Sequence, residues 1–318
     1  MKITVLDHPR ENPGEIRWDA LYEFGEVSFF DTTPAEKVAE RVGDAEIVLL
    51  NKTRFSAEAM RLCPNLKMIS VIATGYNTVD MAAARELGIL VCNVPSYGTL
   101  AIAQHAFALL LEITNHVAHH DAEVRKGRRS SDTDWCFWDY PPIELEHKTM
   151  GIFGLGRIGF AMMKMAQGFG MKVIAHDPYI NEEALRTGCR YVSEDELWRE
   201  SDVISLHCPL LPGKEHLINA DVIAKMKDGV IFLNNSRGAL VDEDALAAGL
   251  RSGKISAAGL DAVEYEPIAP EHPLLSLSNC FITPHISWAA LECRQRLVNT
   301  AIDNVRTYLN GAPTNVVS

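Results

Sequence analysis

The chain has 318 residues, 47% of them hydrophobic and 23% charged, and its 30 lysines and arginines against 42 aspartates and glutamates give a formal net charge of −12. This length is enough for about two domains, each with a substantial core. The acidic balance argues against a protein that binds nucleic acid or an anionic membrane surface, because both of these partners require a basic face.

The cysteines and the apolar segments indicate the compartment. The seven cysteines include no CxxC pair and no Cys/His spacing typical of metal ligands, which predicts a reducing environment and no metal site. The first residues show neither the apolar region nor the cleavage site of a signal peptide, and no eighteen uncharged apolar residues run together. We therefore expect a cytoplasmic protein whose partners are neither membranes nor nucleic acids.

Short apolar runs alternate with amphipathic segments from end to end, a pattern typical of α/β domains with parallel sheets. In the first hundred residues we expect strands at 3–7, 27–31, 47–51, 68–73 and 90–94, with helices such as 34–42 and 80–87 between them. Apolar residues at helical spacing then predict a long helix from Thr99, as its N-cap, to about His120. An irregular segment follows at 121–149, and a loop of that length is more often functional or interfacial than idle.

A second series of strands and helices begins at Met150. Its expected strands are 150–154, 172–177, 203–208, 230–234, 257–263 and 280–284, with a helix at 160–169 whose methionines we expect to fill the core. The final amphipathic helix is predicted at 291–309. The pattern predicts two doubly wound parallel-sheet domains, with the second inserted late into the first if the final helix packs against the N-terminal domain.

Residues 154–159 form a GxGxxG pattern that follows an apolar strand directly and opens a helix, which is the context that a dinucleotide-binding loop requires. In such a loop Gly154 permits the tight turn, Gly156 lets the backbone approach a pyrophosphate, and Gly159 lets the helix and the strand pack closely. The helix N-terminus then faces the negative charge of the cofactor. The alternative is a plain strand–turn–helix unit with no ligand.

Asp177 ends the next expected strand, where a carboxylate can accept hydrogen bonds from both hydroxyls of the adenosine ribose. Pro178 and Tyr179 follow, so no arginine stands there to bind a 2′-phosphate. The sequence therefore favours NAD over NADP. The alternative for Asp177 is a solvated turn residue beside a proline.

Three further strand ends carry charged residues into loops that converge on one edge of a parallel sheet. Arg237, Glu266 and His285 follow the strands expected at 230–234, 257–263 and 280–284. The planar fork of arginine matches a carboxylate or polarises a carbonyl, and an unperturbed histidine exchanges a proton at about pH 6.5. A carboxylate on the far nitrogen of the histidine would fix its tautomer, stabilise the imidazolium and raise its pKa. This is the equipment for hydride transfer between NADH and a 2-oxo acid.

Each of these three residues also has a structural alternative. Arg237 could cap a helix or form a surface ion pair, Glu266 could be a solvated loop carboxylate, and His285 is one of eleven histidines. Their joint placement at consecutive strand ends favours the catalytic interpretation.

At these residues the chain resembles the D-2-hydroxyacid dehydrogenase family. The similar blocks lie along nearly the whole chain, at 73–80, 94–99, 154–159, 201–210, 235–242, 259–263 and 282–285. The resemblance implies an α/β fold of two Rossmann/flavodoxin-like domains. A cofactor domain at 100–288 would be inserted into a substrate domain made of 1–99 and 289–318.

The resemblance also implies roles for individual residues. His285 would be the acid/base, Glu266 its partner and Arg237 the substrate anchor, while Thr74 and Gly75 would present backbone amides to the substrate carboxylate. Further cofactor contacts would come from Arg157, Ile158, Cys208, Pro209, Asn235, Ser236, Asp261 and Trp288. Members of the family are typically homodimers that associate through the cofactor domains.

Within the family the chain is most similar to the glycerate dehydrogenase or hydroxypyruvate reductase branch, on residues 73–77, 97–99, 103–105, 134–138 and 285–288. This implies a small 2-oxo acid such as hydroxypyruvate or glyoxylate as substrate. In that branch an aromatic loop can reach a neighbouring subunit, so Trp138 is a candidate for substrate contact in trans, with ordinary interface packing as the alternative. Leu100 and Leu211 depart from the pattern of the branch and affect the choice of substrate more than the chemistry.

Two other functions use the same fold. Formate or phosphite oxidation is disfavoured because formate enzymes of this fold place glutamine where Glu266 stands. A non-catalytic NAD-sensing protein, similar to the corepressors that share the fold, would bind NADH without turnover.

Overall fold

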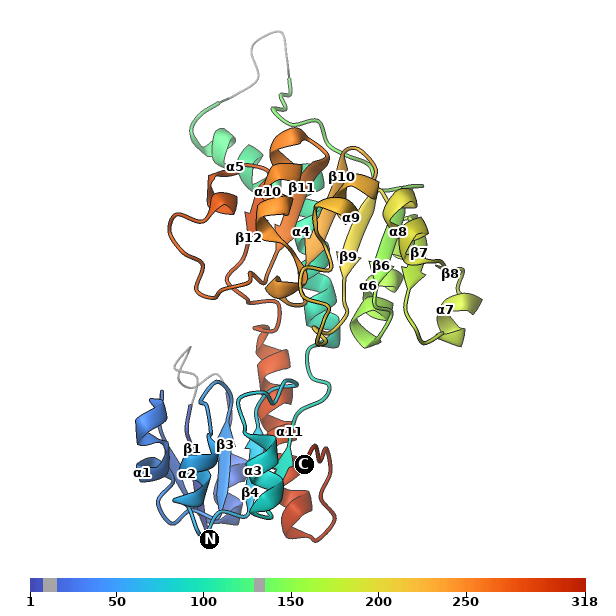
Figure 1. Cartoon of the computed structure of the whole chain (residues 1–318). Helices are drawn as coiled ribbons and strands as arrows, with labels where there is room; N and C mark the ends of the chain where they lie inside the picture. The colour runs from blue at the N-terminus through green and yellow to red at the C-terminus, as the bar shows by residue number, and fades with distance from the viewer. Residues whose placement is uncertain (8–15, 129–134) are drawn as a thin grey trace. The chain divides into compact units, whose positions relative to one another are not determined.

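The computed structural model describes residues 1–7, 16–128 and 135–318, and the chain divides into two compact units. The first unit comprises residues 1–98 and 289–318, and the second comprises residues 99–288. Each unit contains one parallel sheet with helices on its faces (Figure 1). The second unit is thus inserted into the first, between Gly98 and Ala289.

The sheet of the first unit has five parallel strands in the order β2-β1-β3-β4-β5. These are β1 (Lys2–Val5), β2 (Glu26–Phe29), β3 (Ile47–Leu50), β4 (Met68–Val71) and β5 (Leu90–Cys92). Short helices connect them, namely α1 (Val38–Val42), α2 (Ala57–Arg61) and α3 (Met81–Glu86).

The last helix, α11 (Leu291–Leu309), packs against this first sheet. Its buried Leu297, Val298 and Ile302 share one core cluster with Ile3, and the Ser70 hydroxyl of β4 donates to the Ala301 carbonyl at 3.2 Å. The chain therefore returns to its N-terminal unit through α11, which is held there by the burial of its apolar face.

The sheet of the second unit has seven parallel strands in the order β12-β11-β10-β9-β6-β7-β8. These are β6 (Thr149–Phe153), β7 (Lys172–His176), β8 (Arg190–Tyr191), β9 (Val203–Leu206), β10 (Val230–Asn234), β11 (Ile255–Leu260) and β12 (Cys280–Ile282). The strand order reverses between β6 and β9, and ligands of such sheets bind at this switch point beyond the carboxyl ends of the strands.

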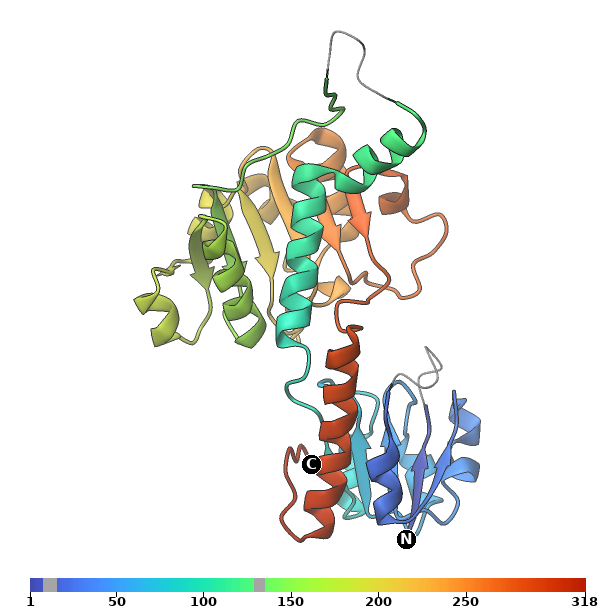
Figure 2. The ribbon, with the colours of Figure 1, turned by 180° about the vertical axis from the view of Figure 1, so that it is seen from behind.

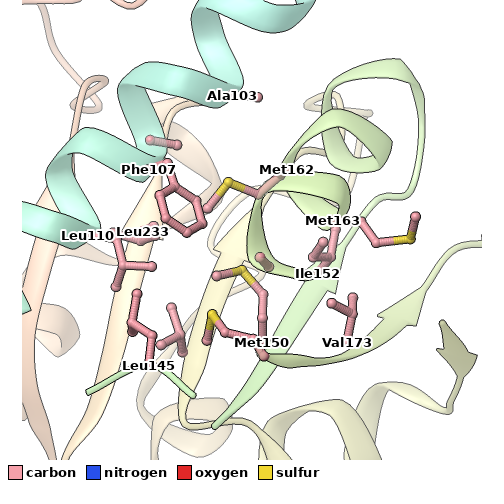
Figure 3. Packing of buried hydrophobic residues seen from close by; sticks show 14 of the residues in the cluster. Ala103, Phe107, Leu110, Leu145, Met150, Ile152, Met162, Met163, Val173 and Leu233 are labelled. Carbon is pink, nitrogen blue, oxygen red and sulfur yellow. The ribbon is translucent and has the colours of Figure 1, made fainter. Parts of the chain in front are cut away.

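Helices cover both faces of this sheet. One face carries α4 (Thr99–Asn115) and α6 (Arg157–Gly168), which Figure 2 shows in front of the strands, and the other carries α8 (Glu194–Glu200), α9 (Ala220–Lys225) and α10 (Glu243–Ser252). The helix α7 (Glu182–Arg186) leads into β8. Figure 3 shows the core under α4 and α6, where Phe107 and Leu110 meet Met150, Met162 and Met163. The prediction that these methionines fill the core is confirmed.

The predicted single helix from Thr99 to His120 is wrong. Helix α4 starts with Thr99 as its first helical residue and ends at Asn115, and a second helix, α5 (Val117–Arg125), follows. His116 between them has a φ of 47°, and its ring stacks on Tyr140 with centroids 4.2 Å apart. A contact with a residue 24 positions later thus breaks the helix, and apolar periodicity carries no signal of it.

Several other boundaries also differ from the expectation. Most predicted strands are shorter at their carboxyl ends. At β1 and β7 the last predicted residues, Asp7 and Asp177, lie outside the sheet and bind loop amides. In the predicted helix 34–42 only Val38–Val42 is α-helical, after a 3-10 turn at Ala35–Lys37. The two-residue strand β8 was not predicted, since it is too short to show alternation.

Among the described residues, no helix combines the length and the apolar character that crossing a bilayer would require.

Candidate active site

The strands β10, β11 and β12 are neighbours in the second sheet, and each leads into a loop at the same edge. His285 and Glu266 meet there. The Nδ1 of His285 lies 2.9 Å and 2.8 Å from the two carboxylate oxygens of Glu266. Since an ionised carboxylate only accepts, Nδ1 carries the proton and Nε2 is left to exchange one with a substrate. The two side chains are 41% and 40% exposed, so both are reachable from solvent.

The backbone of His285 has a left-handed φ of 56°. This conformation costs a residue with a Cβ about 1–2 kcal/mol and persists only where neighbouring contacts fix it. The His285 amide donates to the Thr283 carbonyl at 2.9 Å, and the His285 carbonyl accepts from the Trp288 indole at 2.8 Å. The imidazole is therefore presented by a fixed turn.

Arg237 stands in a turn organised by the buried side chain of Asn234. The Asn234 amide group donates to the Arg237 carbonyl at 2.9 Å and accepts from the Ser236 amide at 3.0 Å. The Ser236 hydroxyl in turn donates to the Leu206 carbonyl at 2.8 Å. The Arg237 guanidinium donates to the Ser236 carbonyl and forms no ion pair with a carboxylate of the described chain. Its other donors are available to an anionic ligand.

The loop that carries Glu266 rests on Gly238 and Glu243. A Cβ on Gly238 would lie 1.9 Å from the Val263 carbonyl carbon, so only glycine lets the Arg237 turn pass this loop. The 9% exposed Glu243 accepts from the Glu264 amide at 3.0 Å and pairs with His272 at 3.0 Å. The arginine and glutamate loops are thereby packed against each other.

The glycine loop lies between β6 and α6. A Cβ on Gly154 would meet the Cys208 amide at 2.7 Å, and one on Gly159 would meet the Gly154 carbonyl at 2.1 Å, so both positions require glycine. A Cβ on Gly156 would meet no described heavy atom within 4 Å. The loop therefore has an open side where a pyrophosphate could approach the backbone at the α6 N-terminus. Arg157 and Ile158 form the first turn of α6 on that side.

Asp177 follows β7 beside this loop. One carboxylate oxygen accepts from the Leu155 amide at 2.7 Å, and the other accepts from the Tyr179 amide at 2.8 Å. Each oxygen keeps a second lone pair. Asp177 therefore orders the glycine loop. It also keeps the acceptor sites that the predicted contact with a ribose requires.

The Asn235 side chain fits a cofactor as well. Both its amide oxygen and its amide nitrogen are buried, and neither has a hydrogen-bond partner in the described structure. Leaving such groups unpaired costs about 1–3 kcal/mol each, so a polar ligand at this strand end would satisfy them. Cys208 and Pro209 follow β9 against the glycine loop, and burial raises the pKa of the Cys208 thiol to about 11, which keeps it protonated at neutral pH.

Thr74 and Gly75 lie in the first unit, in the loop after β4. The Thr74 hydroxyl donates to the Val94 carbonyl at 2.8 Å, and the Thr74 carbonyl accepts from the Asn93 side chain at 2.7 Å. This loop is fixed by its neighbour after β5. The contact of its amides with a substrate carboxylate stays a prediction.

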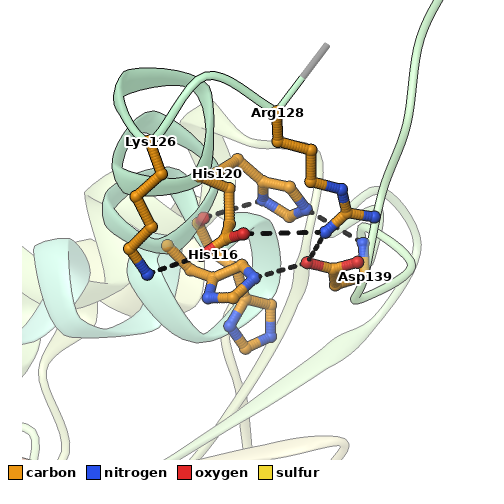
Figure 4. Close-up of polar contacts among 7 residues, drawn as sticks. His116, His120, Lys126, Arg128 and Asp139 are labelled. Atoms are coloured by element: carbon orange, nitrogen blue, oxygen red, sulfur yellow. Dashed lines mark hydrogen bonds and ion pairs between the residues drawn. The ribbon is translucent and has the colours of Figure 1, made fainter. Parts of the chain in front are cut away.

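Trp138 lies in the segment that leads into the amino end of β6, whereas the catalytic loops follow the carboxyl ends of the parallel strands of the same sheet. Figure 4 shows how the segment is held: the Asp139 carboxylate lies 2.7 Å from His119 Nε2 and 2.6 Å from Arg128. These contacts with His119 and Arg128 hold the pKa of the Asp139 carboxyl below its usual value. The Trp138 side chain is 61% exposed. The contact of Trp138 with a substrate stays a prediction.

Comparison with known proteins shows which family this site belongs to. Residues 107–287 match the family model described as D-isomer specific 2-hydroxyacid dehydrogenase, NAD binding domain. The chain is 53% identical to a hydroxypyruvate reductase of Blautia hydrogenotrophica, with 100% of both chains covered. The chain belongs to the D-isomer specific 2-hydroxyacid dehydrogenase family.

Further relatives support the glycerate dehydrogenase or hydroxypyruvate reductase branch of this family. A glycerate dehydrogenase of Methylorubrum extorquens is 34% identical over 99% of this chain and 98% of its own. Among solved structures, D-lactate dehydrogenase of Aquifex aeolicus complexed with NAD and lactic acid has a TM-score of 0.81 at 29% identity, covering 98% of this chain and 96% of that chain. The chain is thus a dehydrogenase-family member with a nicotinamide-binding Rossmann domain.

Several residues that build this dehydrogenase site were not predicted from the sequence. They support the three charged residues through contacts of their own and are Asn234, Gly238, Glu243 and Thr283. Gly238 carried one signal, since a glycine directly after a turn arginine suggests close backbone approach. Asn234 binds Ser236 and Arg237 of its own turn, a local pattern typical of asparagine in turns. Glu243 and Thr283 act through partners 21 and 22 residues away, so no local pattern reveals them.

Proposed function

We propose that this protein reduces a small 2-oxo acid of the hydroxypyruvate or glyoxylate type to the D-2-hydroxy acid, and catalyses the reverse reaction, with NAD as cofactor. The observation that carries the proposal is the two-oxygen contact of Glu266 with His285 Nδ1 at an edge shared with Arg237. The hydroxypyruvate reductase with 53% identity supports the same substrate class.

The residues divide the work as follows. Arg237 binds the carboxylate and polarises the carbonyl of the substrate through its unpaired guanidinium donors. In the reduction the imidazolium of His285 gives its Nε2 proton to the carbonyl oxygen and becomes the neutral ring with its proton on Nδ1, and in the reverse reaction Nε2 takes the proton back. Glu266 holds the Nδ1 proton and stabilises the imidazolium in both directions. As the family resemblance implies, the backbone amides of Thr74 and Gly75 would bind the substrate carboxylate.

A nicotinamide cofactor fits the second unit. The glycine loop would take its pyrophosphate, Asp177 its adenosine ribose, and Asn235 and Asp261 would lie toward its nicotinamide end. Arg157, Ile158, Cys208, Pro209, Ser236 and Trp288 would provide the remaining contacts. When bound, the cofactor supplies or accepts the hydride.

A substrate panel tests this function. Purified protein is assayed for NADH oxidation with hydroxypyruvate, glyoxylate, pyruvate, 2-oxobutyrate and phenylpyruvate, and the series is repeated with NADPH. We expect turnover to be fastest with hydroxypyruvate or glyoxylate and NADH. Turnover confined to phenylpyruvate would contradict the substrate class, and tight NADH binding without turnover on any substrate would favour the NAD-sensing alternative.

Replacing Asp177 by alanine is expected to weaken NADH binding about 10- to 100-fold, the worth of hydrogen bonds to a charged group. NADPH binding should weaken much less, so the ratio of kcat/KM for NADH over that for NADPH should fall. Asp228→Ala is the matched control, because this exposed aspartate of the same unit forms a surface ion pair with Lys254. An unchanged ratio in Asp177→Ala would remove Asp177 from cofactor selection.

We propose that the protein forms a homodimer, and the surface around α5 supports this proposal. This helix has no buried residue, Val117 and Val124 are exposed on it, and the segment after it exposes Trp135 at 90% and Trp138 at 61%. Apolar surface of this kind marks an interface. We infer that a second copy covers it and that Trp138 then contacts the substrate of the partner site.

Mixed dimers test this arrangement. Trp138→Ala and His285→Ala proteins should each have low activity, and mixing them under subunit exchange should restore activity. The mixed dimer contains one site with an intact His285 and the Trp138 of the other subunit. If mixing restores nothing while sedimentation shows mixed dimers, Trp138 does not act in trans.

A further inference from the structure

Asp261 follows β11 and is 1% exposed, so its carboxylate depends on protein hydrogen bonds instead of water. Oδ1 accepts from the Thr283 hydroxyl at 2.6 Å and from the Ile286 amide at 2.9 Å, while Oδ2 accepts from the Ser287 amide at 2.8 Å. Both amides belong to the residues directly after His285. Asp261 therefore holds the catalytic turn by its backbone.

A second histidine faces this carboxylate from a different element. His105 of α4 places Nε2 at 3.0 Å from the Thr283 hydroxyl oxygen and 3.6 Å from Asp261 Oδ1. Among the described residues no lysine or arginine forms an ion pair with Asp261. His105 thus brings a ring nitrogen to this buried carboxylate and to the hydroxyl that donates to it.

The direction of these hydrogen bonds follows from the groups involved. The carboxylate can only accept, so the short 2.6 Å contact has the Thr283 hydroxyl as donor. The Thr283 oxygen then accepts from His105, which places a proton on Nε2 of that imidazole. We call His105, Thr283 and Asp261 the Asp261 network.

The Asp261 network has a mechanical consequence for His285. The left-handed φ of 56° at His285 needs contacts on both sides of the residue to persist. On the carboxyl side these contacts are the two amides bound to Asp261. A misplacement of a catalytic group by about 1 Å costs up to about 100-fold in rate, so a loosened turn should appear in kcat.

We propose that His105 is a positioning residue: through the Thr283 hydroxyl it completes the bonding of Asp261 and thereby fixes the turn that presents His285. This proposal rests on the proposed function, in which His285 exchanges the substrate proton. It predicts that a residue of α4 affects the chemical step through the Asp261 network.

Kinetics of two variants at position 105 test the proposal. His105→Ala should lower kcat with hydroxypyruvate about tenfold, with the Kd of NADH changed less than about twofold and the melting temperature nearly unchanged. His105→Gln keeps an N–H donor at similar reach and should restore most of kcat. His147→Asn is the control, since this exposed histidine also has a left-handed φ, which asparagine tolerates.

Two variants at position 283 give an independent test of the proposal. Thr283→Val removes the hydroxyl at nearly constant shape and should lower kcat like His105→Ala, whereas Thr283→Ser keeps it and should not. If all four variants have the same kcat as wild type, or if Gln fails to rescue where Ala is slow, the positioning role is wrong.

A second readout separates this proposal from the proposed function. Hydrogen exchange followed by mass spectrometry reports the Ile286 and Ser287 amides directly, and it needs no turnover. We expect faster exchange there in His105→Ala and wild-type exchange in His105→Gln. Exchange unchanged in His105→Ala would overturn the Asp261 network, while absence of turnover in the wild-type protein would overturn only the function.

Discussion

Replacing His285 by alanine is expected to lower kcat about 10²- to 10⁴-fold, the usual worth of a general acid/base. The structure gives the reason: Glu266 holds Nδ1 from two oxygens, and Nε2 is the one ring nitrogen left to exchange a proton. NADH affinity, measured by fluorescence titration, should change little, because the side chain acts on the substrate. Stopped-flow or steady-state NADH oxidation measures kcat.

A variant of Glu266, which binds His285 Nδ1, extends this prediction. Glu266→Gln keeps a group that can accept from Nδ1 but carries no charge to stabilise an imidazolium, so we expect a smaller loss, of about tenfold. A kcat near that of wild type in His285→Ala would remove His285 from the mechanism. Equal losses in both variants would show that the charge of Glu266, and not only its orientation of the ring, is indispensable.

Arg237→Lys is expected to lower kcat/KM for the 2-oxo acid about 100-fold, with both kcat and KM affected. Lysine keeps the charge but lacks the planar fork that binds a carboxylate through two parallel bonds. The Arg237 guanidinium donates to the Ser236 carbonyl and pairs with no carboxylate of the described residues, so its remaining donors would bind the substrate. Initial rates over a range of substrate and NADH concentrations separate KM from kcat.

The control for this substitution is Arg199→Lys, a surface arginine on α8 that pairs with Asp195 at 3.5 Å. It should leave both constants unchanged, as expected for an exposed ion pair. A kinetically silent Arg237→Lys would show that Arg237 does not anchor the carboxylate, and the Thr74 loop would then be the next candidate.

Most helices and strands could be predicted from the sequence, because apolar runs and helical periodicity are strong in both units. The final helix, 291–309, has the same bounds in the structure as in the expectation, since its apolar face alone specifies it. The ends of helices and strands that depend on tertiary contacts could not be predicted from the sequence. The break at His116 depends on Tyr140, and the short ends of β1 and β7 depend on loop amides that Asp7 and Asp177 bind.

The candidate site, like the fold, could be predicted only in part from the sequence. Parallel strands bring their carboxyl ends to one edge, so the meeting of Glu266 with His285 could be expected from strand order alone. Of the residues that fix these loops, Glu243 and Thr283 could not be predicted, because both work through partners far along the chain. Thr283 and His105 are 178 residues apart, and Glu243 is 21 residues from the Glu264 amide that it binds.

The most direct test of the account is the stoichiometry and chirality of the reaction. Purified protein is supplied with hydroxypyruvate and NADH, NADH loss is followed by absorbance, and the glycerate formed is resolved by chiral chromatography. The account predicts one D-glycerate for each NADH oxidised, with turnover abolished or strongly reduced in His285→Ala. Formation of L-glycerate, or tight NADH binding with no glycerate at all, would contradict it.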